Sequence, residues 1–283
     1  MQMQSNIKDL IENGEAWLPD LSPEMYYGCD RLGSSRLKAF TTSPLHYHKF
    51  ADMEDTPALI FGRAAHVYNL EGEKVFHEQY CVIPEGYKRN SVKYKDWLAD
   101  QGDRIPISTN DYNKILGMHD TLMSSYAAPY IEQDGFIESS LLWTHCARPF
   151  DSDDIFHIKA KGRIDKLILQ PDESWDILFD YKTCMSVHPY DIQRQIAKFK
   201  YWLQEGWYRD GHLKTRKKNA KMLFLFQEKS PPYDVALVML SDEARLRASN
   251  TCFEITGQIA ECYINDEWPG QNFVIQEWNF RDE

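Results

Sequence analysis

The chain has 283 residues, a formal net charge of −11 and a hydrophobic content of 43%. That hydrophobic content excludes a disordered chain, and the length suffices for one large domain with a substantial core. No apolar run approaches the roughly 20 residues of a membrane span, and the polar residues 1–10 are not typical of a signal peptide, so we expect no membrane partner.

The first predicted elements are two helices. Residues 33–47 (GSSRLKAFTTSPLHY) predict a short helix with Ser34 or Ser35 as its N-cap. Residues 61–71 (FGRAAHVYNLE) predict an Ala-rich helix that carries His66. A single histidine in such a helix is more often structural than a ligand, although neutral imidazole can bind Mn²⁺ and, less well, Mg²⁺.

The next stretch is predicted to be irregular and to be followed by a strand. Residues 84–114 contain scattered Pro and Gly residues and form a candidate insertion that faces the substrate. Residues 136–143 predict a strand. Glu138 lies on this strand and could support a nearby site, but a glutamate on the solvent face is the favoured interpretation.

A β-hairpin is predicted next. Residues 164–169 and 175–181 are apolar runs on either side of a turn at residues 170–174. If Gln170 pairs with Trp175, then Asp165 lies directly opposite Asp180. Facing Cβ atoms are about 4.5–5.5 Å apart, a distance at which like charges destabilise a sheet. The two carboxylates therefore require a cation, and oxygen ligands suit Mg²⁺ or Mn²⁺.

The hairpin also places cations at this position. Lys182 follows Asp180 by two residues and so projects from the same face of the strand. A carboxylate pair with a divalent metal and a lysine can hydrolyse a phosphodiester. Arg163 would face Lys182 across the hairpin, and a bound phosphate would offset the repulsion between these two positive charges. The alternative is a solvated hairpin face, and a register slip of one residue would separate Asp165 from Asp180.

An amphipathic helix is predicted at residues 190–209, with its apolar residues at steps of three and four. Gln204 and Tyr208 lie beside the apolar stripe, four residues apart. Taken separately, each is best interpreted as part of the polar border of a packed helix.

Candidate DNA contacts follow this helix. A chain with a net charge of −11 must gather its cations on one surface to bind DNA. Lys214, Arg216, Lys217 and Lys218 form the densest such group, and a solvated loop is an equal alternative. Arg63, one turn before His66, is a candidate contact to a terminal phosphate.

The remaining elements complete an α/β pattern. Residues 222–227 and 235–240 predict strands, Ser241 caps a helix that runs to about residue 264, and residues 273–278 predict a last strand. The expected fold is a central mixed β-sheet flanked by helices.

Several of these segments, in this order, resemble one nuclease family. Asp165 with Asp180-Tyr181-Lys182 (GRID…DYKT) resembles the core motif of the PD-(D/E)XK nuclease superfamily. The local sequence around this motif is similar to that of the RecB-type branch and, within it, to that of the RecE (exonuclease VIII) C-terminal nuclease domain. Residues 33–47, residues 61–71 and the pair Gln204-x-x-x-Tyr208 match further motifs of that branch.

The resemblance implies a PD-(D/E)XK core within a single nuclease domain, residues 1–283, with the core at about 33–283. It implies that Asp165, Asp180, His66 and the Tyr181 carbonyl hold Mg²⁺, which Mn²⁺ can replace. It also implies that Lys182 orients the attacking water or stabilises the transition state. The side chains that would contact DNA are Arg63, Arg163, Gln204, Tyr208, Lys214, Arg216, Lys217 and Lys218.

Cysteine placement argues against other metal centres. Relatives with an iron–sulfur cluster carry cysteine before the motif's proline, whereas this chain has Ser43-Pro44. The six cysteines are scattered without a C-x-x-C pair, so we expect neither an iron–sulfur cluster nor a zinc site. They indicate free thiols in a reducing cytoplasm, here that of a bacterial host.

The resemblance further implies an exonuclease that acts on double-stranded DNA ends, 5′-to-3′, and leaves 3′ single-stranded tails for recombination. Such enzymes work as ring-shaped homo-oligomers, here a trimer or tetramer, with a single-strand annealing partner in phage recombination. Two alternatives remain: a non-catalytic DNA-binding or scaffold protein with a nuclease fold, and a phosphoesterase that acts on nucleotides.

Overall fold

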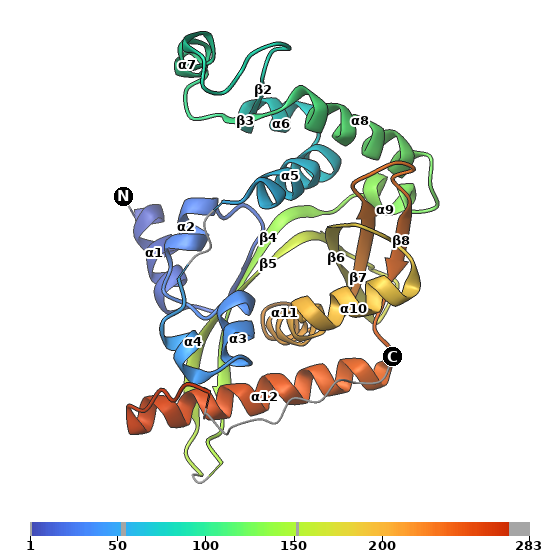
Figure 1. Ribbon diagram of the computed structural model, residues 1–283. Helices are drawn as coiled ribbons and strands as arrows, with labels where there is room; N and C mark the ends of the chain where they lie inside the picture. The colour runs from blue at the N-terminus through green and yellow to red at the C-terminus, as the bar shows by residue number, and fades with distance from the viewer. Residues whose placement is uncertain (1, 52–54, 151–152, 272–283) are drawn as a thin grey trace, which may run out of the picture.

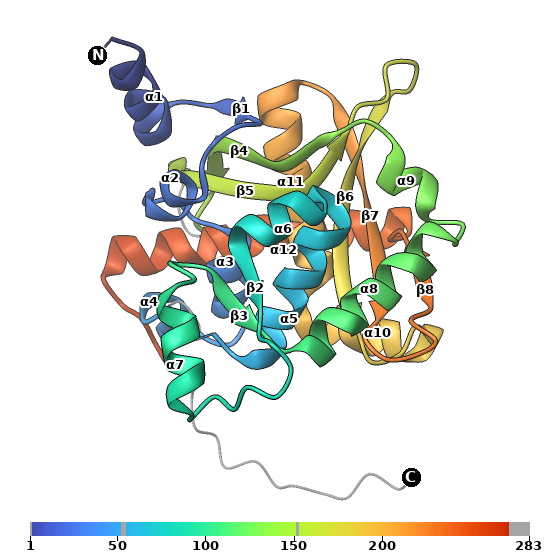
Figure 2. The same cartoon turned by 90° about the horizontal axis from the view of Figure 1, so that it is seen from above.

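A six-stranded mixed sheet lies between two layers of helices (Figures 1 and 2). The computed structural model describes residues 2–51, 55–150 and 153–271. The strand order is β1-β4-β5-β6-β7-β8, in which β6 and β7 are parallel and all other neighbours are antiparallel. The predicted α/β fold with a central mixed sheet is confirmed.

The predicted strands at residues 136–143, 222–227 and 235–240 correspond to β4, β7 and β8. The one predicted at 273–278 lies outside the described residues. The strands are β1 (Ala16–Leu18), β2 (Tyr80–Val82), β3 (Ile105–Ile107), β4 (Phe136–Ala147), β5 (Phe156–Ile168), β6 (Trp175–Cys184), β7 (Asn219–Glu228) and β8 (Val235–Val238).

Each face of the sheet packs on its own hydrophobic cluster. One face is covered by α3 (Ser34–Phe40), α10 (Pro189–Phe199), α11 (Tyr201–Arg216) and α12 (Asp242–Asn265). The other is covered by α5 (Pro57–His66), the π-helix η1 (Val67–Glu71), α6 (Glu73–Gln79), α8 (Thr109–Met123) and α9 (Ala128–Glu132). The remaining helices are α1 (Gln2–Asn13), α2 (Pro23–Gly28), α4 (Pro44–His48) and α7 (Val92–Ala99). None of the described helices is both long and apolar enough to cross a membrane.

Helix starts follow local sequence, with one correction. Thr56 accepts a hydrogen bond from Leu59 N, and Pro57 follows it as the first residue of α5. Ser241 caps α12 as expected. The expected cap at Ser34 or Ser35 is wrong, because Gly33 is the N-cap of α3 and has no side chain that could donate or accept.

The predicted helix at residues 190–209 is two helices. Lys200 adopts the left-handed conformation, with φ of 54°, and separates α10 from α11. The break interrupts the expected apolar stripe, because Phe199 is 46% exposed while Leu203 and Trp207 are completely buried. In the first two turns of α11, residues 203–208 are all buried.

Residues 84–114 are more regular than expected. They contain α7, β3 and the start of α8. β3 pairs in parallel with β2 to form a small second sheet. Figure 1 shows α7 and this small sheet projecting away from the main sheet at the top of the view.

Candidate active site

The two aspartates lie where β5 and β6 separate. The pairs Leu167↔Leu178 and Ile168↔Ile177 have the predicted register. The ladder ends at Lys166↔Phe179, one residue before Asp165 and Asp180. Here the Asp165 carboxylate takes the place of a backbone acceptor, since Tyr181 N donates to Asp165 Oδ2 over 2.8 Å. We call this opening between the strands the fork.

A third carboxylate lies in the same row across the sheet. In β4, Ile137 pairs with Lys166 and Ser139 with Ile164, so Glu138 lies opposite Asp165, but the two form no ladder pair. Glu138 has φ of 51°, a left-handed conformation that a non-glycine residue in a strand rarely adopts. Such strain costs about 1–3 kcal/mol and is typical of functional sites. The expectation that Glu138 lies on a solvent face is wrong, because its carboxylate contacts His66 and Arg163 and is largely buried.

His66, the last residue of α5, points into this acidic row. Its Nε2 lies 3.4 Å from Glu138 Oε1 and 3.5 Å from Asp165 Oδ2. This buried nitrogen has no hydrogen-bond partner among the described residues. Burial opposes protonation of the imidazole, but the carboxylates, Asp165 foremost, outweigh it and raise the pKa of His66 to about 9. The site thus attracts a cation, either a proton on His66 or a metal ion.

Glu71 adds another carboxylate that sequence reasoning missed. Ligand atoms of His66, Glu71 and Glu138 all lie within 4.8 Å of one another. His66 and Glu71 are five residues apart, a spacing that shares one side only because residues 67–71 form a π-helix. A helical pattern of 3.6 residues per turn does not predict this pairing. Burial, followed by the charge of Glu138, raises the pKa of Glu71.

Asp180 is held from two sides. Lys182 Nζ lies 2.5 Å from its Oδ2, and Gln204 Nε2 donates to its Oδ1 over 2.7 Å. Burial raises the pKa of Asp180 to about 6, although Lys182 opposes the shift. Burial also disfavours the charged form of Lys182, but Asp180 and Asp165 outweigh it and raise the pKa of Lys182. Lys182 therefore carries its positive charge at neutral pH.

Lys38 is a second cation near Asp180 and was not predicted. Its Nζ donates to Gln204 Oε1 over 2.9 Å, so Gln204 is bonded at both ends of its amide. Lys38 and Lys182 both lie near the ring of Tyr201, at 5.3 and 5.2 Å from its centroid. Burial, followed by the charge of Lys182, lowers the pKa of Lys38 to about 7.

The backbone of Tyr181 faces the fork while its side chain is anchored elsewhere. The hydroxyl donates to Gln227 Oε1 over 2.7 Å and accepts from Asn69 Nδ2 over 3.1 Å. Because the N–H and C=O of one strand residue point to the same side, the Tyr181 carbonyl lies on the side where its N–H meets Asp165. This orientation suits the predicted role of that carbonyl as a metal ligand.

The other predicted DNA contacts have protein partners. Arg163 contacts Glu138, and donates to Leu21 O over 3.0 Å. It does not face Lys182 as expected, since the β5–β6 ladder ends before that position. Arg63 is half-exposed and lies 2.6 Å from Asp55. Tyr208 is buried, 7% exposed, so its ring is part of the core beside the site.

The basic residues after α11 lie away from the fork. Lys218 Nζ is 2.8 Å from the buried Asp176, and Arg216 lies over the ring of Trp17 at 4.1 Å. Asp176 and Lys182 are six residues apart in one strand, roughly 20 Å at about 3.3 Å per residue. The structure therefore does not bring Lys214, Arg216, Lys217 and Lys218 to the predicted site.

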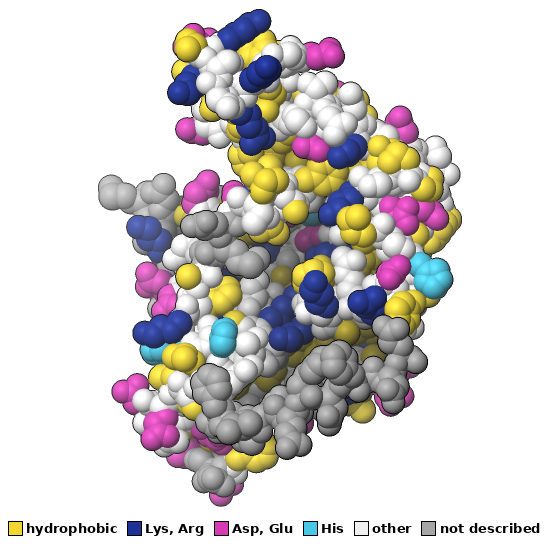
Figure 3. All heavy atoms as spheres, in the orientation of Figure 1, with side chains coloured by type: hydrophobic (Ala, Val, Ile, Leu, Met, Phe, Trp, Pro, Cys, Tyr) yellow, Lys and Arg dark blue, Asp and Glu magenta, His cyan; other side chains and the backbone are white. Residues whose placement is uncertain are grey.

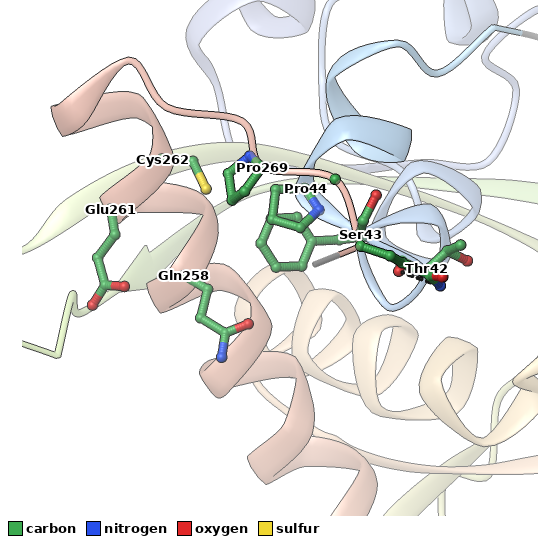
Figure 4. A pocket seen from close by; sticks show the side chains of 10 residues that line it. Thr42, Ser43, Pro44, Gln258, Glu261, Cys262 and Pro269 are labelled. Carbon is green, nitrogen blue, oxygen red and sulfur yellow. Dashed lines mark hydrogen bonds between the residues drawn. The ribbon is translucent and has the colours of Figure 1, made fainter. Parts of the chain in front are cut away.

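The molecular surface is hollowed between α5 and the layer of α3 and α11. Figure 3 shows acidic side chains at the bottom of this hollow and Lys and Arg side chains around it. A separate pocket of about 500 Å³ lies between α4 and the end of α12 and contains none of the fork residues (Figure 4). Its lining includes Ser43, Pro44, Gln258 and Glu261.

Comparisons with known proteins agree with this architecture. A crystal structure of a candidate exonuclease from Eubacterium rectale has a similar fold, with a TM-score of 0.59 and 11% sequence identity, over 92% of this chain and 96% of that one. No curated protein matches the sequence. A family model described as "PDDEXK-like domain of unknown function (DUF3799)" matches residues 33–274, and the chain therefore belongs to this PDDEXK-like family.

Proposed function

We propose that this protein is a metal-dependent DNA exonuclease. The observation that carries the proposal is the row of Glu138, Asp165 and Asp180 across three neighbouring strands, with His66 and Lys182 in contact with it. Membership of a PDDEXK-like family supports hydrolysis of phosphodiesters, and the relative described as a candidate exonuclease supports action at DNA ends.

The donor set in the fork fits a hard divalent cation. Asp165, Asp180, His66 and the Tyr181 carbonyl would hold it, and Glu71 and Glu138 add oxygen donors. Carboxylates, a carbonyl and one imidazole suit Mg²⁺ or Mn²⁺ rather than a thiophilic metal. The buried His66 Nε2, which lacks a hydrogen-bond partner among the described residues, is the orphan donor that such an ion would satisfy. When bound, the ion supplies Lewis acidity toward phosphoryl oxygens and lowers the pKa of water.

Lys182 performs the second part of the chemistry. Its ammonium is charged at neutral pH and lies against Asp180, at the open side of the β5–β6 ladder. There it orients the attacking water or neutralises charge that develops on the phosphoryl oxygens. Gln204 and Lys38 keep the Asp180 carboxylate in place for this reaction.

The polarity, products, assembly and partner that we propose come from the resemblance to RecE. We include 5′-to-3′ polarity, product duplexes with 3′ single-stranded tails, a ring of three or four subunits and a single-strand annealing partner in this proposal. A ring suits an acidic chain, since it turns the cations of each subunit toward the enclosed DNA and the acidic surface outward.

The test compares an end-labelled linear duplex with a closed circle, each with and without Mg²⁺. Loss of the linear duplex alone, only with Mg²⁺, is the expected result, and labels at the 5′ or 3′ end report the polarity. Cleavage of the closed circle would indicate an endonuclease instead of an exonuclease. Intact DNA in every reaction would contradict the proposed function and favour a scaffold role, and hydrolysis of free nucleotides alone would favour a phosphoesterase.

A further inference from the structure

Residues 84–104 form a projection that we call the arm. It leaves the molecule after β2, contains α7, and returns at β3. The β2–β3 pairing, together with the hydrogen bond from Ile83 N to Ile107 O at 2.9 Å, ties its two ends together. In Figures 1 and 3 the arm overhangs the face of the molecule that contains the hollow.

The arm has a small aromatic core of its own. Tyr94 is buried, and its ring lies 5.8 Å from that of Trp97. The ring of Tyr87 lies 6.2 Å from Trp97, and Lys93 Nζ lies 4.3 Å from the centroid of Tyr87. These contacts hold the backbone of the arm together at a distance from the main core.

The tip of the arm is an exposed basic segment of an acidic chain. Residues 86–95 hold Lys88, Arg89, Lys93 and Lys95 and no Asp or Glu, whereas the whole chain has 32 Lys and Arg against 43 Asp and Glu. All four side chains are exposed. The ion pairs found in the described part of the chain involve none of them. The acids of the arm lie outside this tip in the sequence: Glu85 precedes it, and Asp96, Asp100 and Asp103 follow it.

The contrast with the basic residues after α11 is informative. Lys218 is paired with Asp176, and Arg216 and Lys221 lie over the rings of Trp17 and Trp175. Those cations stabilise the fold. In the arm, Lys93 lies over the ring of Tyr87, but the side chains of Lys88, Arg89 and Lys95 have no ion pair or ring contact among the described residues. Because like charges repel, the clustering of these three cations indicates an anionic partner.

We propose that the arm binds the phosphate backbone of duplex DNA at a distance from the end that enters the fork. The inference rests on the proposed function, because the substrate it assigns to the arm is the one hydrolysed at the fork. Sequence-independent binding requires only regularly spaced phosphates and exposed cations, which the arm offers without groups aimed at base edges. The exposed cations at the tip of the arm thereby add positive surface to a chain whose net charge is −11.

The experiment uses the full chain with the triple substitution Lys88→Gln, Arg89→Gln and Lys95→Gln. Lys93 is left intact because it packs on Tyr87. Affinity for a labelled duplex is measured by anisotropy over a range of salt concentrations, without Mg²⁺. Two duplexes are compared, of about one and about three helical turns, so that only the longer reaches beyond the fork.

The expected result is weaker binding of the long duplex and a salt slope that is smaller by about 0.9 for each phosphate that the variant no longer neutralises. Binding and Mg²⁺-dependent hydrolysis of the short duplex should not change. The matched control removes three exposed cations elsewhere, Lys8→Gln, Lys49→Gln and Arg247→Gln, and should leave the slope as in the wild type.

Three outcomes overturn the inference. If the wild type hydrolyses DNA and the arm variant binds the long duplex with an unchanged salt slope, the arm does not bind DNA, and the proposed function is unaffected. If the arm variant instead changes the molecular mass by light scattering with unchanged DNA affinity, the arm is a contact between subunits. If the wild type binds no duplex at all, both the arm and the proposed function fail.

Discussion

Gln204 Nε2 donates a hydrogen bond to Asp180 Oδ1 over 2.7 Å, from the second turn of α11 to the middle of β6. The other end of the amide accepts from Lys38 Nζ, so the orientation of the amide is determined by its partners. Gln204 is 7% exposed and both ends of its amide are bonded within the protein. Its place beside the site is thus that of a residue that positions Asp180.

We expect Gln204→Ala and Lys38→Met each to lower the rate of DNA hydrolysis by about 10–100-fold, because partners of metal-ligating groups typically have effects of this size. The loss should appear in kcat and in Mn²⁺ affinity, while DNA affinity measured without metal should change little. Lys198→Met, on the exposed side of α10, is the control. An unchanged kcat in Lys38→Met would show that the contact of Lys38 with Gln204 does not contribute to hydrolysis.

Asp165→Ala, Asp180→Ala and Lys182→Ala should each abolish hydrolysis, with losses on the order of 10²–10³ or more, because each removes charge at the place where charge develops in the reaction. Circular dichroism should show an unchanged fold, since the sheet core on both faces does not depend on these side chains. Any of the three variants with full activity would contradict the assigned site.

His66→Ala, Glu138→Gln and Glu71→Gln should each weaken Mn²⁺ binding at least tenfold, roughly 1.4 kcal/mol, when titrated by calorimetry. DNA binding without metal should be affected less. The elements measured in the purified protein should not include stoichiometric zinc or iron. If Glu71→Gln alone binds Mn²⁺ normally, the π-helix contributes no ligand.

Metal affinity should rise with pH. A metal ion competes with a proton for His66, whose pKa is about 9, and for Asp180, whose pKa is about 6. Mn²⁺ binding should therefore release about one proton between about pH 6 and 9, from His66, and more below about pH 6, where Asp180 is protonated as well. In His66→Ala the dependence should flatten in the upper part of this range, and an unchanged profile would show that His66 is not a ligand.

Glu205 should make the fold sensitive to pH. It is completely buried in α11, and burial raises its pKa to about 7 although Arg209 and Arg245 oppose the shift. A raised acid pKa costs stability above about pH 7 and nothing below the usual value of 4.5. Glu205→Gln should therefore stabilise the protein by about 1–3 kcal/mol at pH 8.5 and much less at pH 4.5, measured by urea unfolding. Glu254→Gln, on the exposed side of α12, is the control and should show no such difference.

The central hairpin could be predicted from sequence because its determinants are local. A polar turn between two apolar runs sets the register, and the two-residue period of a strand places Lys182 on the face of Asp180. The register found at Leu167↔Leu178 agrees with that reasoning. The cap and length of α12 follow from Ser241 and the apolar pattern after it in the same way.

Tertiary structure decided the rest of the site. Glu138 joins it only because β4 lies beside β5 and adopts a left-handed φ at that residue, and Glu71 only because the chain after His66 forms a π-helix. Lys38 reaches Gln204 from a helix 166 residues away in sequence. The local periods of helix and strand are written in the sequence, whereas these contacts depend on which elements pack together. The same packing pairs Lys218 with Asp176 and leaves Lys88, Arg89 and Lys95 of the arm exposed.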